Sequence, residues 1–257
     1  MVQNEAAAPG VVSVGQLTPD APWRWLGAGW RDLMRRPHLS IGYGLLVVSA
    51  GVGLNYLLWI SGFASLIPVA LGVFAILGPL LAVGLYELSR RYETGEPPGL
   101  FPVKFAGPRS PIQLAYIGFF LMFAALVWLR IAMLLYALFA SAMYQPLDDF
   151  LTFAITTGSG LAMLAVGTVI GGFIAFGIYL LTVVSIPMLM NERSDPFTAI
   201  AVGVNAFQKS PGAMLLWAWL IAFIVAAGIA TLFVGLAIAF PLLGHATWHA
   251  YRDIRAL

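Results

Sequence analysis

The sequence predicts an all-α, polytopic membrane protein with six transmembrane helices arranged as three hairpins, preceded by an N-terminal interfacial amphipathic helix. Of the 257 residues, 61% are hydrophobic and 9% are charged, against roughly 45–50% and about 25% in soluble domains. Long apolar segments alternate with short polar loops. The basic residues gather in alternate loops, which is typical of loops on the cytoplasmic side of a membrane.

The N-terminal residues divide into two segments. Residues 1–22 combine Pro, Gly and small polar residues without periodicity and are predicted to form a disordered tail. They show no cleavable signal peptide, so the first span would also act as the targeting signal. Residues 23–36 then place apolar side chains at helical spacing, at Leu26, Trp30, Leu33 and Met34. This pattern predicts an amphipathic helix in the headgroup layer; the alternative is a short helix packed on other protein.

Residues 23–257 are predicted to form a single six-helix membrane domain. Ser61 and Gly62 leave room only for a tight turn, so the first two spans form an antiparallel hairpin. The last apolar block, Ala213–Tyr251, is too long for one span of about 20 residues and is divided near Val234–Gly235. A short acidic connection follows the third span, and a short helix is predicted across Phe197–Phe207. The predicted spans are 39–61, 63–85, 112–142, 158–190, 213–233 and 235–251.

The distribution of charge favours an even number of spans. With six spans and a cytoplasmic N-terminus, twelve of the 13 Lys and Arg residues lie in inner segments. The outer connections carry only Asp148 and Asp149. Five or seven spans would move some basic clusters outside. We therefore expect a multi-pass protein of a bacterial inner membrane with both termini in the cytoplasm.

A weak internal similarity fits the three hairpins. Pro79 precedes Arg90 by eleven residues, and Pro241 precedes Arg252 by the same offset. The fourth span also carries Pro187 near its inner end. Proline frees a backbone carbonyl in a membrane helix and permits a bend. The return helix of each hairpin is thus predicted to bend near the cytoplasmic face.

Arg130 is the one charge inside the apolar segment from Pro111 to Met143. It lies thirteen residues before Met143, about 20 Å along a helix. A guanidinium at such depth calls for a partner or a water path. Two interpretations stay open: a structural pair with Asp148 or Asp149, or a contact that lines a substrate or ion pathway.

Three histidines form a weak candidate site for a metal or haem. His245 and His249 have i, i+4 spacing, which places both imidazoles on one helical face. His38, at the inner end of the first span, would approach from the same side. The alternative is that these histidines lie at the inner interface and bind nothing. No cofactor is predicted, and the absence of Cys excludes disulfides and Cys-ligated clusters.

Glu87 lies three and four residues before Arg90 and Arg91 at the inner end of the second span. This spacing predicts an ion pair on the cytoplasmic face. A carboxylate in a proton relay is the alternative. The sequence contains no Walker loop, HExxH motif, Ser-His-Asp order or Rossmann fingerprint, so no catalytic residue is predicted and the chain is not expected to be an enzyme.

Several blocks of sequence resemble a bacterial family of integral membrane proteins, domain of unknown function 2189. They are GWRDLMRRPHLSIGYG, GLYELSRRYETGEPP, WLRIAMLLYALF, IPMLMNERSDPFTAI and PLLGHATWHAYRD. The similarity covers about Gly29 to Asp253. Some members of the family carry the label putative cytochrome c oxidase subunit, which implies a respiratory-membrane connection. Six spans and three histidines do not suffice for the catalytic subunit of such an oxidase.

Two classes of function follow. The first is a non-catalytic accessory or assembly subunit of a membrane complex, possibly a respiratory one, whose partners are the lipid bilayer and other membrane proteins and include no nucleic acid. The second is a small transporter or channel with Arg130 lining the pathway. The low number of charges inside the spans favours the first class.

Overall fold

The structure, a computed structural model, describes residues 15–97, 108–140 and 147–256, with the side chains of residues 147 and 148 left out. All regular secondary structure in these ranges is helical. The elements are α1 (Ala21–Arg35), α2 (Pro37–Ile60), the short 3-10 helix η1 (Ala64–Leu66), α3 (Ile67–Leu81), α4 (Val83–Thr94), α6 (Pro111–Phe139), α7 (Leu147–Thr156), α8 (Gly158–Thr182), α9 (Ser185–Asn191), α10 (Pro196–Lys209), α11 (Pro211–Ala230) and α12 (Leu236–Ala256).

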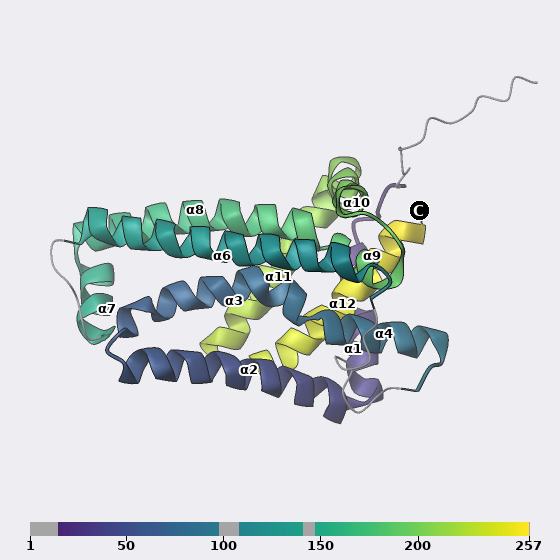
Figure 1. The fold of residues 1–257 in the computed structure, drawn as a ribbon, viewed down its shortest axis with the longest axis horizontal. Coiled ribbons are helices and arrows are strands. Elements are labelled where there is room, and N and C mark those ends of the chain that lie inside the picture. The colour runs from purple at the N-terminus through teal and green to yellow at the C-terminus, as the bar shows by residue number, and fades with distance from the viewer. Residues whose placement is uncertain (1–14, 98–107, 141–146, 257) are drawn as a thin grey trace, which may run out of the picture.

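Five of the six predicted spans correspond to helices long and apolar enough to cross a membrane. Within the described ranges these are Pro37–Ile60, Ala64–Thr94, Pro111–Phe139, Gly158–Asn191 and Pro211–Ala230. The predicted sixth span is helical but is not among these helices, and the second half of α12 carries polar and charged residues that lower its hydropathy. In Figure 1 the turn between α11 and α12 also lies nearer the middle of the long axis than the turn between α2 and α3. The third hairpin is therefore shorter than the other two.

Helix α1 packs on protein through one face, which is the alternative considered for this segment. Trp25, Gly29 and Leu33 are buried, whereas Trp30 and Met34 of the expected apolar face are exposed. A Cβ atom on Gly29 would lie 2.6 Å from the backbone nitrogen of Ala246, so α1 and α12 are in very close contact. The buried face of α1 therefore shares Leu33 with the predicted apolar face but also includes Trp25 and Gly29, which the prediction left out.

The described part of the chain begins at residue 15, before the boundary predicted at residue 22. The N–H of Leu17 donates to Oγ of Ser210 at 2.8 Å, and Ala21 and Pro22 are buried at the start of α1. Residues 1–14, which make up most of the predicted tail, lie outside the described residues.

The return helices differ in how they accommodate proline. Helix α8 ends at Thr182, five residues before Pro187, and α9 begins at Ser185, two residues before it. The interruption therefore includes Val183, four residues before Pro187, whose carbonyl would clash with the proline ring in a continuous helix. In α12, Pro241 lies inside a continuous helix. The carbonyl of Ala237, four residues earlier, faces Gly44 of α2, and a Cβ atom there would lie 2.9 Å from the ring of Pro241. Gly44 thus permits close contact between α2 and α12.

The connections after the third and fourth spans are helical. The short acidic connection predicted after the third span contains α7, in which Phe150, Phe153 and Ala154 are buried. These residues pack on Leu135 of α6 and Met163 of α8 in a small core of their own. The short helix predicted across Phe197–Phe207 is confirmed as α10.

The polar elements gather at one end of the bundle. Figure 1 shows α1, α4, α9, α10 and the C-terminal part of α12 at one end of the long axis, and α7 at the other. We call the first the polar end. The turns α2–η1 and α7–α8 and the C-terminal end of α6 lie toward the α7 end. The long apolar helices α2, α3, α6 and α8 run between the two ends.

Candidate functional site

His245 lies at the centre of a buried polar cluster at the polar end. Its side chain has no exposed surface. Nε2 of His245 is 2.9 Å from Oγ of Ser40, and Nδ1 is 2.7 Å from Oγ of Ser89. Oγ of Ser89 also donates to Oδ2 of Asp32 at 2.8 Å, and Nε2 of His249 is 2.8 Å from the same oxygen. These five residues, the His245 cluster, join α1, α2, α4 and α12.

The contacts of the cluster determine the tautomer of His245. A carboxylate only accepts hydrogen bonds, so the single proton of the Ser89 hydroxyl points to Asp32. Oγ of Ser89 must then accept a hydrogen bond from Nδ1–H of His245. In the neutral ring Nε2 is left as an acceptor, and it receives the hydroxyl proton of Ser40. All the hydrogen bonds therefore run in one direction, from Ser40 through His245 and Ser89 to Asp32.

Asp32 supplies the negative charge of the cluster. Burial raises the pKa of its carboxyl group, but the hydrogen bonds from His249 and Ser89, together with the nearby imidazoles, outweigh burial and lower the pKa below its ordinary 3.8. Asp32 is therefore ionised at neutral pH, as the direction of the hydrogen bonds requires.

Small residues bring the helices of the cluster together. A Cβ atom on Gly84 of α4 would lie 2.6 Å from the ring of Tyr43 in α2. A Cβ atom on Gly244 of α12 would lie 2.6 Å from Leu85 of α4. Close approach of the backbones allows short serine side chains to reach His245 from two neighbouring helices.

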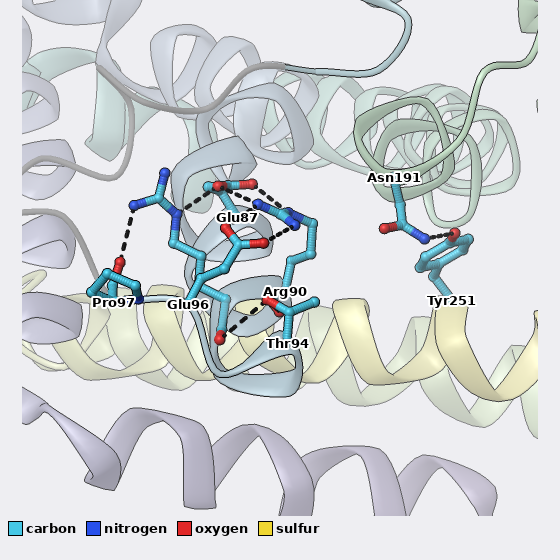
Figure 2. A network of polar contacts seen from close by, with 8 residues as sticks. Glu87, Arg90, Thr94, Glu96, Pro97, Asn191 and Tyr251 are labelled. Atoms are coloured by element: carbon cyan, nitrogen blue, oxygen red, sulfur yellow. Dashed lines mark hydrogen bonds and ion pairs between the residues drawn. The ribbon is translucent and has the colours of Figure 1, made fainter.

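Glu87 forms a second polar group at the same end. Its side chain is 3% exposed, and its carboxylate accepts from Nε of Arg90 at 2.9 Å and from Nε of Arg91 at 2.6 Å. Figure 2 shows the guanidinium group of Arg90 beside both Glu87 and Glu96, which each accept hydrogen bonds from it. The ion pairs predicted from the spacing are confirmed, and they are more buried than a surface pair.

Glu192 is the centre of a third group, which joins the end of α9 to α12. It accepts from the hydroxyl of Tyr251 at 2.6 Å and from two nitrogens of Arg255. The side-chain amide of Asn191 donates to the Tyr251 hydroxyl at 2.9 Å, as Figure 2 shows. Burial raises the pKa of Glu192, but the hydrogen bonds from Arg255 and Tyr251 lower it by more than burial raises it. The pKa of Glu192 therefore lies below its ordinary value of 4.5.

The contact between Ser40 and His245 has the components of a serine nucleophile and its base. A nucleophile must reach a substrate, however, and neither side chain has any exposed surface. In this conformation the pair links helices and does not present Ser40 to a substrate.

The three candidate metal ligands are not brought together. Both ring nitrogens of His245 contact serine hydroxyls, and Nε2 of His249 contacts Asp32. His38 is exposed near the start of α2. Across the part of the chain that the structure describes, no group of three His, Cys, Asp or Glu residues could hold a metal ion.

Arg130 lies on the outward face of α6. It is exposed and borders a shallow depression formed with Phe123, Leu126, Val127, Ile131 and Leu134 of the same helix. Among the described side chains no ion pair joins it to Asp149, which is exposed on α7; the side chain of Asp148 lies outside the described residues. Trp128 and Ala132, each two residues away, line the interior cavity. At about 100° per residue, these two side chains lie on the face of α6 opposite Arg130, which is not among the residues that line the cavity.

The interior of the bundle contains a large apolar cavity, which we call the central cavity. It has a volume of about 1220 Å³ and is partly open to the surroundings of the bundle. Residues of α2, α3, α6, α8, α11 and α12 line it. Because the cavity is partly open and its wall is mostly apolar, hydrocarbon of a surrounding bilayer could enter it.

Sequence patterns found only part of this site. His245, His249, Glu87 and both arginines were singled out by their spacing within one helix. Asp32, Ser40 and Ser89 were not, because each is a single polar residue on a different helix. The only sequence feature that could have indicated these three residues is a small polar residue inside or beside an apolar segment. That feature occurs at many positions of the chain, so it does not single them out.

Comparison with known proteins agrees with the resemblance seen in the sequence. Residues 66–191 match the family described as predicted integral membrane protein (DUF2189), which confirms the resemblance over α3 to α9. No curated protein and no solved structure matches the chain.

Proposed function

We propose that this DUF2189 membrane protein is a non-catalytic accessory or assembly subunit of a larger membrane complex, and that it binds its partner through the outward face of α6. The observation that carries the proposal is the exposure of Arg130 among large apolar side chains. Phe123, Leu126 and Leu134 around it are 57%, 61% and 58% exposed. A face of this kind lies against lipid or against another protein.

The charge of Arg130 selects the partner. Helix α6 ends at Phe139, nine residues beyond Arg130 and therefore about 13 Å along the axis. A lone guanidinium inside the hydrocarbon costs about 2.5–3.5 kcal/mol or more. A carboxylate in a transmembrane helix of the partner would offset this cost with a charge-assisted hydrogen bond. The surrounding Phe and Leu side chains would pack against the same helix.

The proposal includes the topology of six spans in a bacterial inner membrane, with both termini in the cytoplasm. It is supported by the location of the basic residues. Apart from Arg130, the described Lys and Arg residues lie on elements of the polar end or at the adjoining helix starts. This concentration at one end is what cytoplasmic loops require. The respiratory nature of the complex is proposed from the family resemblance alone.

The test is co-purification in mild detergent followed by identification of the bound proteins. Arg130→Leu removes the charge and keeps an apolar surface. We expect it to lower the yield of the partner at least about tenfold, the effect of about 1.4 kcal/mol, without changing the melting temperature of the isolated chain. Arg193→Ala, which removes an exposed arginine outside the spans, is the matched control and should leave the yield unchanged.

A charge exchange makes the result specific. If an acidic residue in a span of the identified partner is replaced by Arg, then Arg130→Glu should restore binding that either change alone abolishes. Equal yields of partner for the wild-type chain and Arg130→Leu would contradict the proposal and assign Arg130 to the lipid headgroups, which its long side chain reaches by extending toward the interface.

A further inference from the structure

We propose that the exposed face of α1 binds anionic phospholipids, such as phosphatidylglycerol, at the membrane surface beside the polar end. The proposal is independent of the proposed function, which concerns the outward face of α6. It depends on three observations: the place of α1 in the bundle, an exposed apolar stripe along this helix, and arginines beside the stripe that have no acidic partner.

The connection between α1 and α2 places the end of α1 at the membrane surface. Helix α1 ends at Arg35, and α2, which is long and apolar enough to cross a membrane, begins at Pro37. A single residue therefore separates the two helices. Figure 1 shows that α1 runs across the long axis of the bundle, whereas α2, α3, α6 and α8 run along it. A helix with this direction, joined directly to a span, lies in the plane of the headgroups.

An exposed apolar stripe runs along α1 on the side away from its buried face. Trp23, Trp30 and Met34 are 56%, 48% and 44% exposed. At about 100° per residue, these three positions fall within about 40° of one another around the helix, and the buried Trp25 lies about 200° from Trp23. Tryptophan is enriched where headgroups meet acyl chains. The stripe therefore has the composition of a surface that contacts lipid at this level.

Arginines form a second row beside the apolar stripe, because each residue of the stripe is followed directly by one. They are Arg24, Arg31 and Arg35, and Arg36 comes next in the chain. Arg24 forms ion pairs with two aspartates. Arg31, Arg35 and Arg36 are exposed, and no ion pair joins them to an acidic side chain within the described ranges. Arg35 contacts only the ring and the backbone carbonyl of Tyr92.

The charge of these three arginines selects an anionic lipid. Elsewhere at the polar end, Arg90, Arg91, Arg252 and Arg255 each pair with a glutamate. Guanidinium groups without such a partner bind phosphate oxygens through charge-assisted hydrogen bonds. A phosphatidylcholine headgroup carries its own cation, so the net positive charge of α1 favours a lipid without one. A soluble anion would pair with the arginines but leave the apolar stripe in water, whereas a phospholipid covers both rows.

The first measurement is the retention of lipid by the full chain. The protein is purified in mild detergent with equal amounts of phosphatidylglycerol and phosphatidylcholine that have the same acyl chains, and the bound lipids are counted by mass spectrometry. Each basic residue near an anionic surface strengthens binding about fivefold, so we expect the wild-type chain to retain at least about ten times more phosphatidylglycerol than phosphatidylcholine.

Variants assign this preference to the arginines of α1. Arg31→Gln/Arg36→Gln should lower the ratio of the two lipids at least about fivefold. Arg31→Lys/Arg36→Lys keeps both charges and should keep most of the preference, which separates loss of charge from loss of fold. Arg193→Gln is the control, because Arg193 is exposed but lies between Glu192 and Asp195 in the sequence, and it should leave the ratio unchanged.

The second measurement locates the bound lipid. Brominated acyl chains quench the fluorescence of tryptophans that they touch. In vesicles of the two lipids, with bromine on one or the other, phosphatidylglycerol should quench the chain more strongly than phosphatidylcholine. This excess should fall in Trp30→Phe and persist in Trp59→Phe, which removes an exposed tryptophan at the α7 end of α2.

Three results would overturn the proposal. A wild-type ratio near one, or a ratio that is unchanged in Arg31→Gln/Arg36→Gln, would show that α1 does not select anionic lipid. Release of phosphatidylglycerol by a large excess of inorganic phosphate would assign the arginines to a soluble anion. Equal loss of the excess quenching in Trp30→Phe and Trp59→Phe would place the lipid away from α1.

Discussion

Ser89→Ala tests the role of the His245 cluster in holding the polar end together. The change removes the acceptor of Nδ1–H of His245 and one donor to Asp32. A buried donor without a partner costs about 1–3 kcal/mol, and a lost hydrogen bond to a charged group contributes a similar amount. Asp32 keeps its contact with His249, so we expect a total loss of about 2–4 kcal/mol.

The loss is measured as a change in melting temperature of the chain in detergent. At about 2–4 °C per kcal/mol for a chain of this size, Ser89→Ala should lower the melting temperature by roughly 5–15 °C. Ser194→Ala is the control, because the Ser194 hydroxyl contacts only the adjacent carbonyl of Asp195 at 3.3 Å, and it should have almost no effect.

A double variant separates the cluster from simple loss of volume. With His245→Leu already in place, Ser89→Ala removes no hydrogen bond to the imidazole, so the two effects should not add. A melting temperature within about 1 °C of the wild type for Ser89→Ala, or strict additivity with His245→Leu, would refute the proposed chain of hydrogen bonds.

Two further predictions concern acid stability and topology. The pKa of Glu192 is lowered in the folded chain, so its contribution to stability is complete above the ordinary pKa of 4.5 and is lost as the pH falls through the lowered pKa of the folded chain. Glu192→Gln should therefore lower the melting temperature at pH 7 and flatten the decline of the melting temperature in acid. An acid profile equal to that of the wild type would contradict this role of Glu192. The chain has no Cys, so Ala256→Cys and Thr157→Cys each introduce a single thiol. A membrane-impermeant maleimide should label Thr157→Cys in intact cells and Ala256→Cys only after permeabilisation. Labelling of Ala256→Cys in intact cells would place the C-terminus outside and contradict the proposed topology.

Features that depend on neighbouring residues in one helix could be predicted from the sequence. The contacts of Glu87 with Arg90 and Arg91 follow from their spacing, because residues three and four apart lie side by side on a helix. Five spans follow from the length of the apolar segments. The turn at Ser61 and Gly62 also follows, since Gly62 adopts a φ of 78°, which favours glycine.

Features that depend on distant residues could not be predicted in this way. Ser40 and His245 are 205 positions apart, and their contact requires that α2 and α12 lie side by side. The direction of Arg130 depends on which face of α6 meets the rest of the bundle, and an apolar helix in lipid has no polar face to reveal it. The buried face of α1 was missed for a related reason, since Gly29 is buried by close approach and not by hydrophobicity.

The sequence by itself determined that this protein lies in a membrane, that it is helical and that ion pairs form within α4, because hydropathy and spacing are local properties. Tertiary structure alone decided the membership of the His245 cluster, the outward direction of Arg130 and the existence of the central cavity. Each of these depends on which helices are neighbours and how closely their backbones approach. In lipid, that choice rests on small residues and single polar groups, whose effect appears only when the helices are packed.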